Sequence, residues 1–330
     1  MPISQRPLLR RLAAIAITTV SLGLLATHAD AAWPERPIRL LVPYGPGGSS
    51  DVVARAMAAE MSRDLGQQII VENKGGGQGT IATTEVARAT ADGYTLILGH
   101  VGTLAVNPSM MPKLNYDARR DFAPIVLLAK LPMVFAVGKK VAASTLPEFV
   151  QLAKSRPGVL NYGSAGNGSA GHLAFEMLKT AASIDVLHVP YKGTGAQVND
   201  LLAGNIDAAA AGTPGLLPQA QAGSIRIIAV GSSKRLPVLP DVPTVAEQGY
   251  PGFESSQWFG LLAPAGTPPA VIERLHQSAA KALATDAVRT RLAHDASEPS
   301  GAGPAEFAAF IDAEEKRWRQ VVREARLSSE

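Results

Sequence analysis

The chain has 330 residues, of which 46% are apolar, 18% charged and 5% aromatic, and its formal net charge is +3. This composition excludes a disordered or collagen-like chain, and the absence of cysteine excludes a disulfide scaffold, a Cys-ligated metal site and a Cys nucleophile. The length favours two domains over one core.

The first 31 residues have the pattern of a secretory signal peptide. Arg6, Arg10 and Arg11 precede an apolar stretch at residues 12–26, and Ala29-Asp30-Ala31 supplies the small residues of a cleavage site. The stretch is shorter than the roughly 20 apolar residues that span a bilayer. We predict a periplasmic protein that is cleaved after Ala31; the paired arginines leave the export route open.

The same segment carries most of the net charge. Its three arginines and one aspartate leave the remaining chain almost neutral, without a run of Lys or Arg. Nucleic-acid binding needs a clustered basic face. We therefore expect no nucleic-acid partner.

After this segment, apolar runs of strand length alternate with segments of helical period, which predicts an α/β protein with parallel strands. The first set has expected strands at 38–44, 68–72 and 94–99, with helices at 51–65 and 79–89. A long apolar run at 123–137 leads to a second set, with strands at 160–163, 185–189, 206–211 and 225–231 and helices at 146–154, 171–181, 195–203 and 214–222. A Pro-rich irregular stretch at 236–251, a strand at 256–263 and helices at 269–284 and 304–327 complete the chain.

A Gly/Ser loop joins the first strand to the first helix, with the sequence Pro43-Tyr44-Gly45-Pro46-Gly47-Gly48-Ser49-Ser50-Asp51. A loop of this kind before a helix is suited to an anion, because the first-turn N–H groups have no intrahelical partner and carry the positive end of the helix dipole. A plain tight turn capped by Ser50 or Asp51 is the alternative.

The second set has a similar loop, Ser164-Ala165-Gly166-Asn167-Gly168-Ser169-Ala170-Gly171-His172. Two such loops, one in each predicted domain, favour a carboxylate held between them without Arg or Lys. Other candidates near this crevice are His100, Thr103, His172, Thr213 and Trp258, with core packing as the alternative for Trp258 and an ordinary loop histidine as the alternative for His172.

Other chemistries have weaker support. Neither loop matches a nucleotide-binding motif, and neither Ser50 nor Ser169 fits the nucleophile pattern G-x-S-x-G. The histidines do not have the spacing of a zinc site. We expect no cofactor, no metal and no enzyme activity; a secreted hydrolase that uses Ser169 or Ser50 with His172 is the main alternative.

Several segments together resemble the Bug family of extracytoplasmic solute receptors, the substrate-binding proteins of tripartite tricarboxylate transporters. Besides the two loops, the resemblance rests on Trp33-Pro34-Glu35-Arg36-Pro37-Ile38, Val71-Glu72-Asn73, Asp92-Gly93-Tyr94-Thr95-Leu96, Val189-Pro190-Tyr191-Lys192-Gly193, Leu239-Pro240-Asp241-Val242-Pro243-Thr244-Val245-Ala246-Glu247 and Ala263-Pro264-Ala265-Gly266-Thr267-Pro268. It covers nearly all of the chain after residue 31.

The resemblance implies a type II periplasmic binding fold, in which two α/β domains close on a ligand. It implies crossing strands near 125–137 and 254–262, so we predict, after the signal peptide at 1–31, a first domain from 32–130 and 254–330 and a second domain at 131–253. The residues that the resemblance implies bind the ligand's carboxylate are, in the first loop, Tyr44, Gly47, Gly48, Ser49, Ser50 and Asp51, and in the second loop, Ser164, Asn167, Gly168 and Ser169.

The chain departs from the family after Asn73, where Lys74-Gly75-Gly76-Gly77-Gln78-Gly79 replaces the usual Arg-Pro-Gly-Ala-Gly-Gly. Gly75 in place of proline predicts a looser loop. We predict a monomeric receptor that delivers a small carboxylate to a membrane permease of the tripartite tricarboxylate type or presents it to a membrane sensor.

Overall fold

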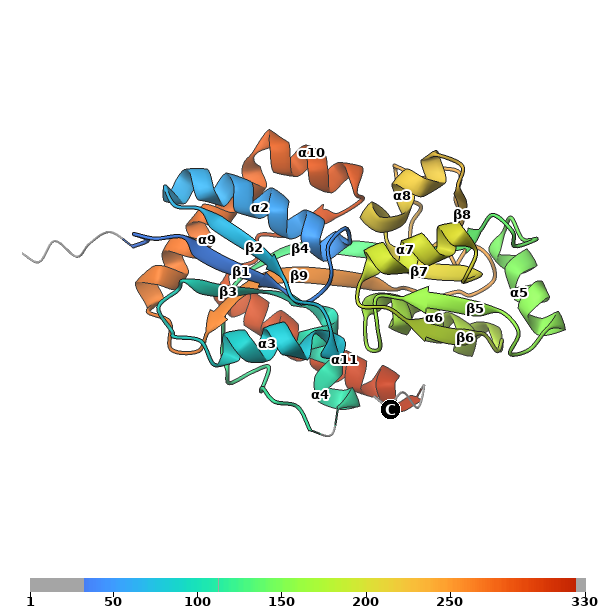
Figure 1. Ribbon diagram of the computed structural model, residues 1–330, viewed down its shortest axis with the longest axis horizontal. Helices are drawn as coiled ribbons and strands as arrows, with labels where there is room; N and C mark the ends of the chain where they lie inside the picture. Colours follow the sequence, from blue (N-terminus) through green and yellow to red (C-terminus); the bar gives the residue numbers. More distant parts are fainter. Residues whose placement is uncertain (1–32, 112, 325–330) are drawn as a thin grey trace, which may run out of the picture. The chain divides into compact units, whose positions relative to one another are not determined.

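One long strand, β4 (Phe122–Gly138), belongs to two groups of strands (Figure 1). The computed structural model describes residues 33–111 and 113–324, so the predicted export signal at 1–31 lies outside the described residues. Residues 122–132 of β4 pair antiparallel with β9 (Ser256–Pro264). Residues 133–138 pair antiparallel with β7 (Ala208–Gly212) and β8 (Ile225–Val230). The strand thus passes from one sheet to the other near residue 132.

We call the group around β9 the first lobe. Its strands run in the order β2-β1-β3-β9-β4, with β1 parallel to β2 and β3, and with β9 antiparallel to β3. The remaining strands and the helices of this lobe are β1 (Ile38–Val42), β2 (Ile69–Asn73), β3 (Thr95–His100), β10 (Glu298–Pro299), α2 (Ser49–Leu65), α3 (Thr80–Ala87), α4 (Asn107–Met110), α9 (Pro269–Ala284), α10 (Asp286–His294) and α11 (Pro304–Glu324). A 3-10 turn at Gly77–Gly79 and a π-helical turn at Gly102–Val106 belong to it as well.

We call the group around β7 the second lobe. Its parallel strands run in the order β7-β5-β6, and β4 joins β7 and β8. The remaining elements are β5 (Asn161–Ser164), β6 (Leu187–Pro190), α5 (Leu146–Ser155), α6 (Ala170–Ala182), α7 (Thr194–Ala203) and α8 (Thr213–Gln221). In both lobes a strand is followed by a helix, so the loops at the carboxyl ends of the strands are available to form a site.

The sequence predicts these elements well. The ends of the expected strands and helices agree with the structure to within two residues, apart from the last helix, which is described only to Glu324. The sequence analysis missed α4, α10 and β10. Helix α10 is weakly amphipathic, since only Val288 and Leu292 are buried, and it begins where the Thr285 side chain accepts from the N–H of Val288.

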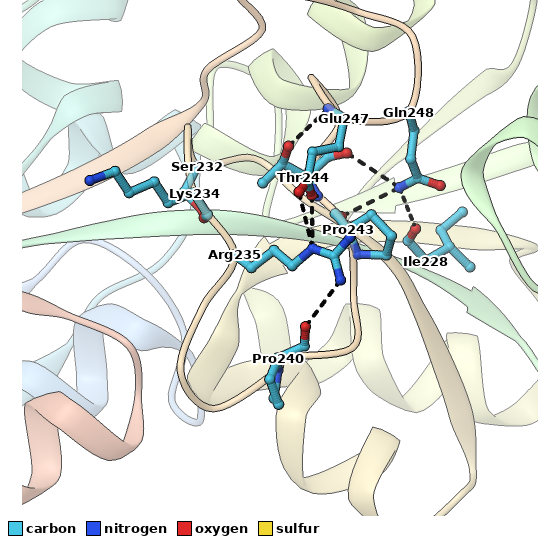
Figure 2. A network of polar contacts seen from close by, with 9 residues as sticks. All are labelled: Ile228, Ser232, Lys234, Arg235, Pro240, Pro243, Thr244, Glu247 and Gln248. Carbon is cyan, nitrogen blue, oxygen red and sulfur yellow. Dashed lines mark hydrogen bonds and ion pairs between the residues drawn. The ribbon is translucent and has the colours of Figure 1, made fainter.

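The Pro-rich stretch between β8 and β9 is held by side chains rather than by regular structure (Figure 2). The Arg235 guanidinium pairs with Glu247 at 3.0 Å, and Glu247 Oε2 accepts from the N–H of Thr244 at 2.7 Å. Gln248 Nε2 donates to the carbonyl of Ile228 in β8 at 3.0 Å. These contacts fasten the stretch to the second lobe before the chain enters β9.

Candidate ligand-binding site

A cavity of about 30 Å³, which we call the central cavity, lies between the two lobes at the carboxyl ends of β1, β5 and β7. The lining residues include no Asp, Glu, Lys or Arg, and the one histidine among them is His100. They are Tyr44, Gly45, Gly48, Ser49, Ser50, His100, Met133, Ala165, Ser169, Ala170, Gly171, Thr194, Ala210, Ala211, Gly212 and Gln257.

The starts of four helices meet at the central cavity, three with residues of their first turn and α8 with the preceding residue, Gly212. They come from α2 in the first lobe and from α6, α7 and α8 in the second. Gly48 and Gly212, the residues before α2 and α8, have no side chain that could cap the first turn. N–H groups at a helix start lack intrahelical acceptors and sit at the positive end of the dipole. The cavity is therefore suited to an anion although no cationic side chain lines it.

Glycine allows α6 to reach this position. A Cβ on Gly171 would lie 2.2 Å from the carbonyl oxygen of Ala210 in β7, which is closer than any real side chain approaches. Gly212 similarly faces Ser49 Oγ and Gln257 Nε2, at 2.3 and 2.4 Å from its hypothetical Cβ. The close packing of glycine, alanine and serine keeps the cavity small.

Tyr44, His100 and Gln257 form a neutral hydrogen-bonded wall. The N–H of Gly102 donates to His100 Nδ1 at 2.9 Å, so this nitrogen is an acceptor and Nε2 carries the proton, which it donates to Gln257 Oε1 at 3.0 Å. Burial lowers the pKa of His100 to about 4 and raises the pKa of Tyr44. The Tyr44 hydroxyl lies 3.1 Å from His100 Nδ1. Because the lone pair of Nδ1 already accepts the N–H of Gly102, the Tyr44 hydroxyl can donate its proton to a ligand oxygen.

The first glycine loop (residues 43–48) is braced by an ion pair at the start of α2. The N–H of Gly47, at φ +84°, donates to Asp51 Oδ2 at 3.1 Å, and Arg55 Nε donates to Asp51 Oδ1 at 2.8 Å. Gly47 and Asp51 thus shape the loop, and neither lines the central cavity.

The second glycine loop (residues 165–169) is braced by two stacked histidines. The ring centroids of His172 and His188 lie 4.2 Å apart, and Ser164 Oγ lies 2.6 Å from His188 Nε2. The N–H of Gly168 donates to His172 Nδ1 at 3.1 Å. Burial lowers the pKa of His172 to about 4 and that of His188 to about 3, so both rings are neutral at pH 7.

Of the residues singled out from the sequence, the structure brings Tyr44, Gly48, Ser49, Ser50, His100 and Ser169 together around the central cavity. Asn167 lines an adjoining cavity that shares Tyr44 and Ala165 with it. Gly168 belongs to the second loop and Ser164 and His172 flank it, but none of the three lines the central cavity.

Three further candidates lie elsewhere. Thr103 exchanges hydrogen bonds with the backbone of His100, and the Thr213 hydroxyl donates to the carbonyl of Asp295. Trp258 is buried under α11, where its Nε1 donates to Glu314 Oε2 at 2.9 Å. Successive residues of a strand face opposite sides, so Gln257 reaches the cavity and Trp258 packs in the core.

Sequence reasoning missed Thr194, Gly212 and Gln257. The first two follow the same pattern as the glycine loops, since Gly193 precedes α7, which begins at Thr194, and Gly212 precedes α8. A search for every glycine before a helix would have found both. To find Gln257 one must know which face of β9 points to the cavity, and the largely apolar sequence of that strand does not show this.

The lobes touch directly beside the central cavity. The N–H of Gly45 in the first loop donates to the carbonyl of Lys192 in the second lobe at 3.1 Å. A Cβ on Gly193 would lie 2.9 Å from the nitrogen of Gly45, and one on Gly195 would lie 2.9 Å from the carbonyl oxygen of Pro46. The backbones of residues 45–46 and 192–195 are in direct contact, and any side chain larger than hydrogen at Gly193 or Gly195 would hold the lobes further apart.

Ser169 and His172 do not form the arrangement of an activated nucleophile. Ser169 Oγ accepts from the backbone N–H of His172, which is a helix-capping bond, and the His172 ring accepts from Gly168. A hydroxyl nucleophile instead donates to the ring nitrogen. Among residues 33–111 and 113–324, no three His, Asp or Glu side chains are grouped as a metal site would require.

No helix in the described part of the chain combines the length and the apolar character needed to cross a membrane. Two lobes that share β4, with an uncharged cavity lined by helix starts between them, define a two-lobed solute-binding protein. A family model described as the tripartite tricarboxylate transporter family receptor matches residues 53–327. The chain belongs to this family, so the resemblance to the Bug receptors is confirmed.

Known proteins are similar over nearly the whole chain. BugT of Bordetella pertussis is 38% identical over 318 residues, which cover 96% of this chain and 97% of BugT. A protein of R. palustris solved with adipate is 36% identical, with a TM-score of 0.87, over 90% of this chain and 99% of its own. MatC from Rhodopseudomonas palustris with bound malate is 36% identical, with a TM-score of 0.84, over 88% of this chain and 100% of its own. The periplasmic binding protein BugD is 36% identical, with a TM-score of 0.87, over 90% of this chain and 99% of its own, which confirms the predicted periplasmic-binding fold.

Proposed function

We propose that the chain is an exported periplasmic receptor, which binds a small organic carboxylate between its lobes and delivers it to a membrane permease of the tripartite tricarboxylate type. The observation that carries this proposal is the uncharged central cavity, where four helix starts from both lobes meet. Adipate and malate, the ligands of two similar proteins, are both carboxylates.

In this proposal one carboxylate group occupies the central cavity. The N–H groups at the starts of α2, α6 and α8 donate to its oxygens, together with the hydroxyl groups of Tyr44, Ser49 and Ser169. His100 stays neutral, donates to Gln257 and packs edge-on against the Tyr44 ring. Charge is balanced by helix dipoles and hydrogen bonds, which suits a ligand that must be released again.

The domain division belongs to the same proposal. Residues 32–130 and 254–330 form one domain, and residues 131–253 form the other. The passage of β4 between the two sheets near residue 132 and the return of the chain through β9 support this division. A ligand that contacts both domains favours the arrangement in which they approach each other.

A thermal-shift screen of the protein from Ala32 onward tests the function. The panel contains mono-, di- and tricarboxylates, aromatic acids, acidic amino acids and, as controls, the corresponding amides. A ligand at a hundred times its dissociation constant stabilises the fold by about 2.7 kcal/mol. We expect a carboxylate to raise Tm and to be recovered chemically unchanged. A ligand that is consumed, or no response to any carboxylate, would contradict the proposal.

A further inference from the structure

Gln257 lines the central cavity from a strand at the junction of the lobes. It lies in β9, where it pairs with Leu131 of β4, next to the point at which β4 passes from one sheet to the other. Gln257 is 6% exposed, and among the described residues that line this cavity it is the only carboxamide. A carboxamide has a donor end and an acceptor end, so its orientation decides whether it attracts or repels an anion.

His100 sets this orientation. The backbone N–H of Gly102 can only donate, and it points at His100 Nδ1 from 2.9 Å, so Nδ1 carries no proton. The single proton of the neutral ring is therefore on Nε2, which lies 3.0 Å from Gln257 Oε1. Only the oxygen of a carboxamide accepts a hydrogen bond. Oε1 of Gln257 must therefore face His100, and Nε2 of Gln257 must point away from it.

The ring of His100 is held in place by its neighbours. His100 is 2% exposed, the Tyr44 ring packs edge-on against it at a centroid distance of 4.9 Å, and the Phe259 ring lies at 5.5 Å. If the His100 ring turned over, the N–H of Gly102 would face a carbon and lose its acceptor, which is unfavourable for a buried donor. The hydrogen bonds from Gly102 through His100 to Gln257 thus run in one direction.

The donor end of Gln257 faces the start of α8. A hypothetical Cβ on Gly212 would lie 2.4 Å from Gln257 Nε2 and 2.3 Å from Ser49 Oγ, so two polar groups of the first lobe converge on one residue of the second. Nε2 has no acceptor among the residues that the structure describes, and it is not one of their fully enclosed polar atoms. Ser49, Gly212 and Gln257 all line the central cavity. An anionic oxygen in this cavity satisfies the free donor.

We propose that Gln257 contacts the ligand and that the fixed tautomer of His100 holds its N–H donor toward the bound anion. The inference rests on the proposed function and assigns a role to two residues of the same site. Gln257 donates to the carboxylate from Nε2, and His100, which acts through Gln257, is a positioning residue. The bound carboxylate then joins β9 of the first lobe to the start of α8 in the second.

Isothermal titration calorimetry with substituted proteins tests the contact. The probes are malate, adipate and the carboxylate that gives the largest Tm increase in the thermal-shift panel. Gln257→Met has nearly the length of glutamine but no donor, and Gln257→Glu has the same shape but acceptor oxygens only. His100→Phe keeps an aromatic ring beside Tyr44 and Phe259 without a donor for Oε1, and a double variant combines it with Gln257→Met. The Tm of each unliganded protein shows whether it is folded.

We expect Gln257→Met to weaken binding about tenfold or more, and Gln257→Glu to weaken it at least about a hundredfold, because its charge opposes the bound anion. His100→Phe should weaken binding about threefold to tenfold, since the carboxamide can then turn its oxygen toward the anion. The double variant should bind as Gln257→Met does, because His100 acts through Gln257. Additive losses would overturn the positioning role of His100. An unchanged affinity in Gln257→Met would overturn the inference and leave the receptor function intact.

Nitrogen NMR of the wild type, isotope-labelled in its histidines and glutamines, tests the orientation without a substitution. The His100→Phe and Gln257→Met spectra assign the signals. His100 should carry its proton on Nε2 with and without ligand, and a side-chain N–H signal of Gln257 should shift when the carboxylate is added. A proton on His100 Nδ1, or Gln257 signals that do not move at saturating ligand, would overturn the inference. Binding of no carboxylate by the wild type would overturn the inference and the proposed function together.

Discussion

The two glycine loops resemble each other in sequence but are supported in different ways. Each follows a parallel strand, and each leads into a helix whose first residues line the central cavity. The first loop is braced by the Asp51–Arg55 ion pair, and the residue before its helix is Gly48, which has no capping side chain. The second loop is braced by the neutral rings of His172 and His188, and Ser169 caps its helix.

In the proposed function, the helix start binds the anion, and two different kinds of support hold the helix starts at the cavity. A charged brace and a neutral brace present the same backbone N–H groups to the cavity. The supports should nevertheless respond differently to charge and to pH. Substitutions in each loop and in its supporting side chains can therefore show how much the helix start and its support each contribute to ligand affinity and to stability.

The largest effect is expected from a negative charge in the second loop. Ser169→Asp keeps a good N-cap residue before α6, so the helix should remain intact. The new carboxylate lies where the ligand carboxylate binds in our proposal, and two like charges about 4 Å apart repel by roughly 4 kcal/mol at an effective dielectric constant of 20. We expect an affinity loss of at least a hundredfold by calorimetry at pH 7.

Ser169→Asn is the matched control, because asparagine also caps helices and has nearly the shape of aspartate. Its affinity should stay within a few fold of the wild type. If the two variants lose affinity equally, the loss comes from the serine hydroxyl or the loop shape and not from the added charge, and the expected repulsion at residue 169 is contradicted.

A smaller effect is expected where the first loop meets the second lobe. Gly195→Ala places a Cβ 2.9 Å from the carbonyl oxygen of Pro46 when the lobes touch. Within α7 alone, alanine is favoured over glycine by up to about 1 kcal/mol. We expect Tm without ligand to be unchanged or higher and ligand affinity to be about tenfold lower, because binding favours the touching arrangement. An unchanged affinity would show that this contact is not needed for binding.

Acid should weaken the second loop before the first. The pKa of His172 is lowered to about 4 and that of His188 to about 3 from the ordinary 6.5, so the unfolded chain binds protons at a higher pH than the folded one. Their contribution to stability is complete above pH 6.5 and is lost as the pH falls toward 4 and 3, with a slope of about 1.4 kcal/mol per pH unit for each histidine.

Denaturant unfolding between pH 7 and 4.5 measures this slope, and His188→Gln should reduce it by the contribution of one histidine. Amide hydrogen exchange then locates the change. Faster exchange at residues 164–172 with little change at 47–50 would agree with the comparison; Tyr44 is left out because it contacts His100, whose pKa is also lowered to about 4. Faster exchange at the first loop alone would contradict it.

The helix starts could be predicted from the sequence, whereas much of their surroundings could not. A glycine- and serine-rich loop between an apolar strand and an amphipathic helix is a local pattern, and it predicts Gly48, Ser50 and Ser169 as site residues. The stacking of His188 on His172, and the approach of Gly193 to Gly45, join residues far apart along the chain. Period-two alternation groups the residues of β9 but does not say which face is inside, which is why Trp258 was chosen and Gln257 was missed.

The smallest effect is expected from the brace of the first loop. Asp51→Asn keeps an acceptor for the N–H of Gly47 but removes the charge that pairs with Arg55 and favours the start of α2. A carboxylate in the first turn of a helix stabilises it by about 0.3–1 kcal/mol, so the free energy of unfolding should fall by about that amount. Ligand affinity should rise slightly, by no more than about threefold, because one negative charge near the bound anion is removed.

Arg55→Gln is the matched variant, since it breaks the same ion pair but removes a positive charge. If the brace acts on the ligand only through its charge, the two variants should shift affinity in opposite directions, and 0.5 M salt should reduce both shifts. If both variants lower affinity equally, then the ion pair acts by positioning the N–H groups of the first loop, and its charge matters less than its geometry.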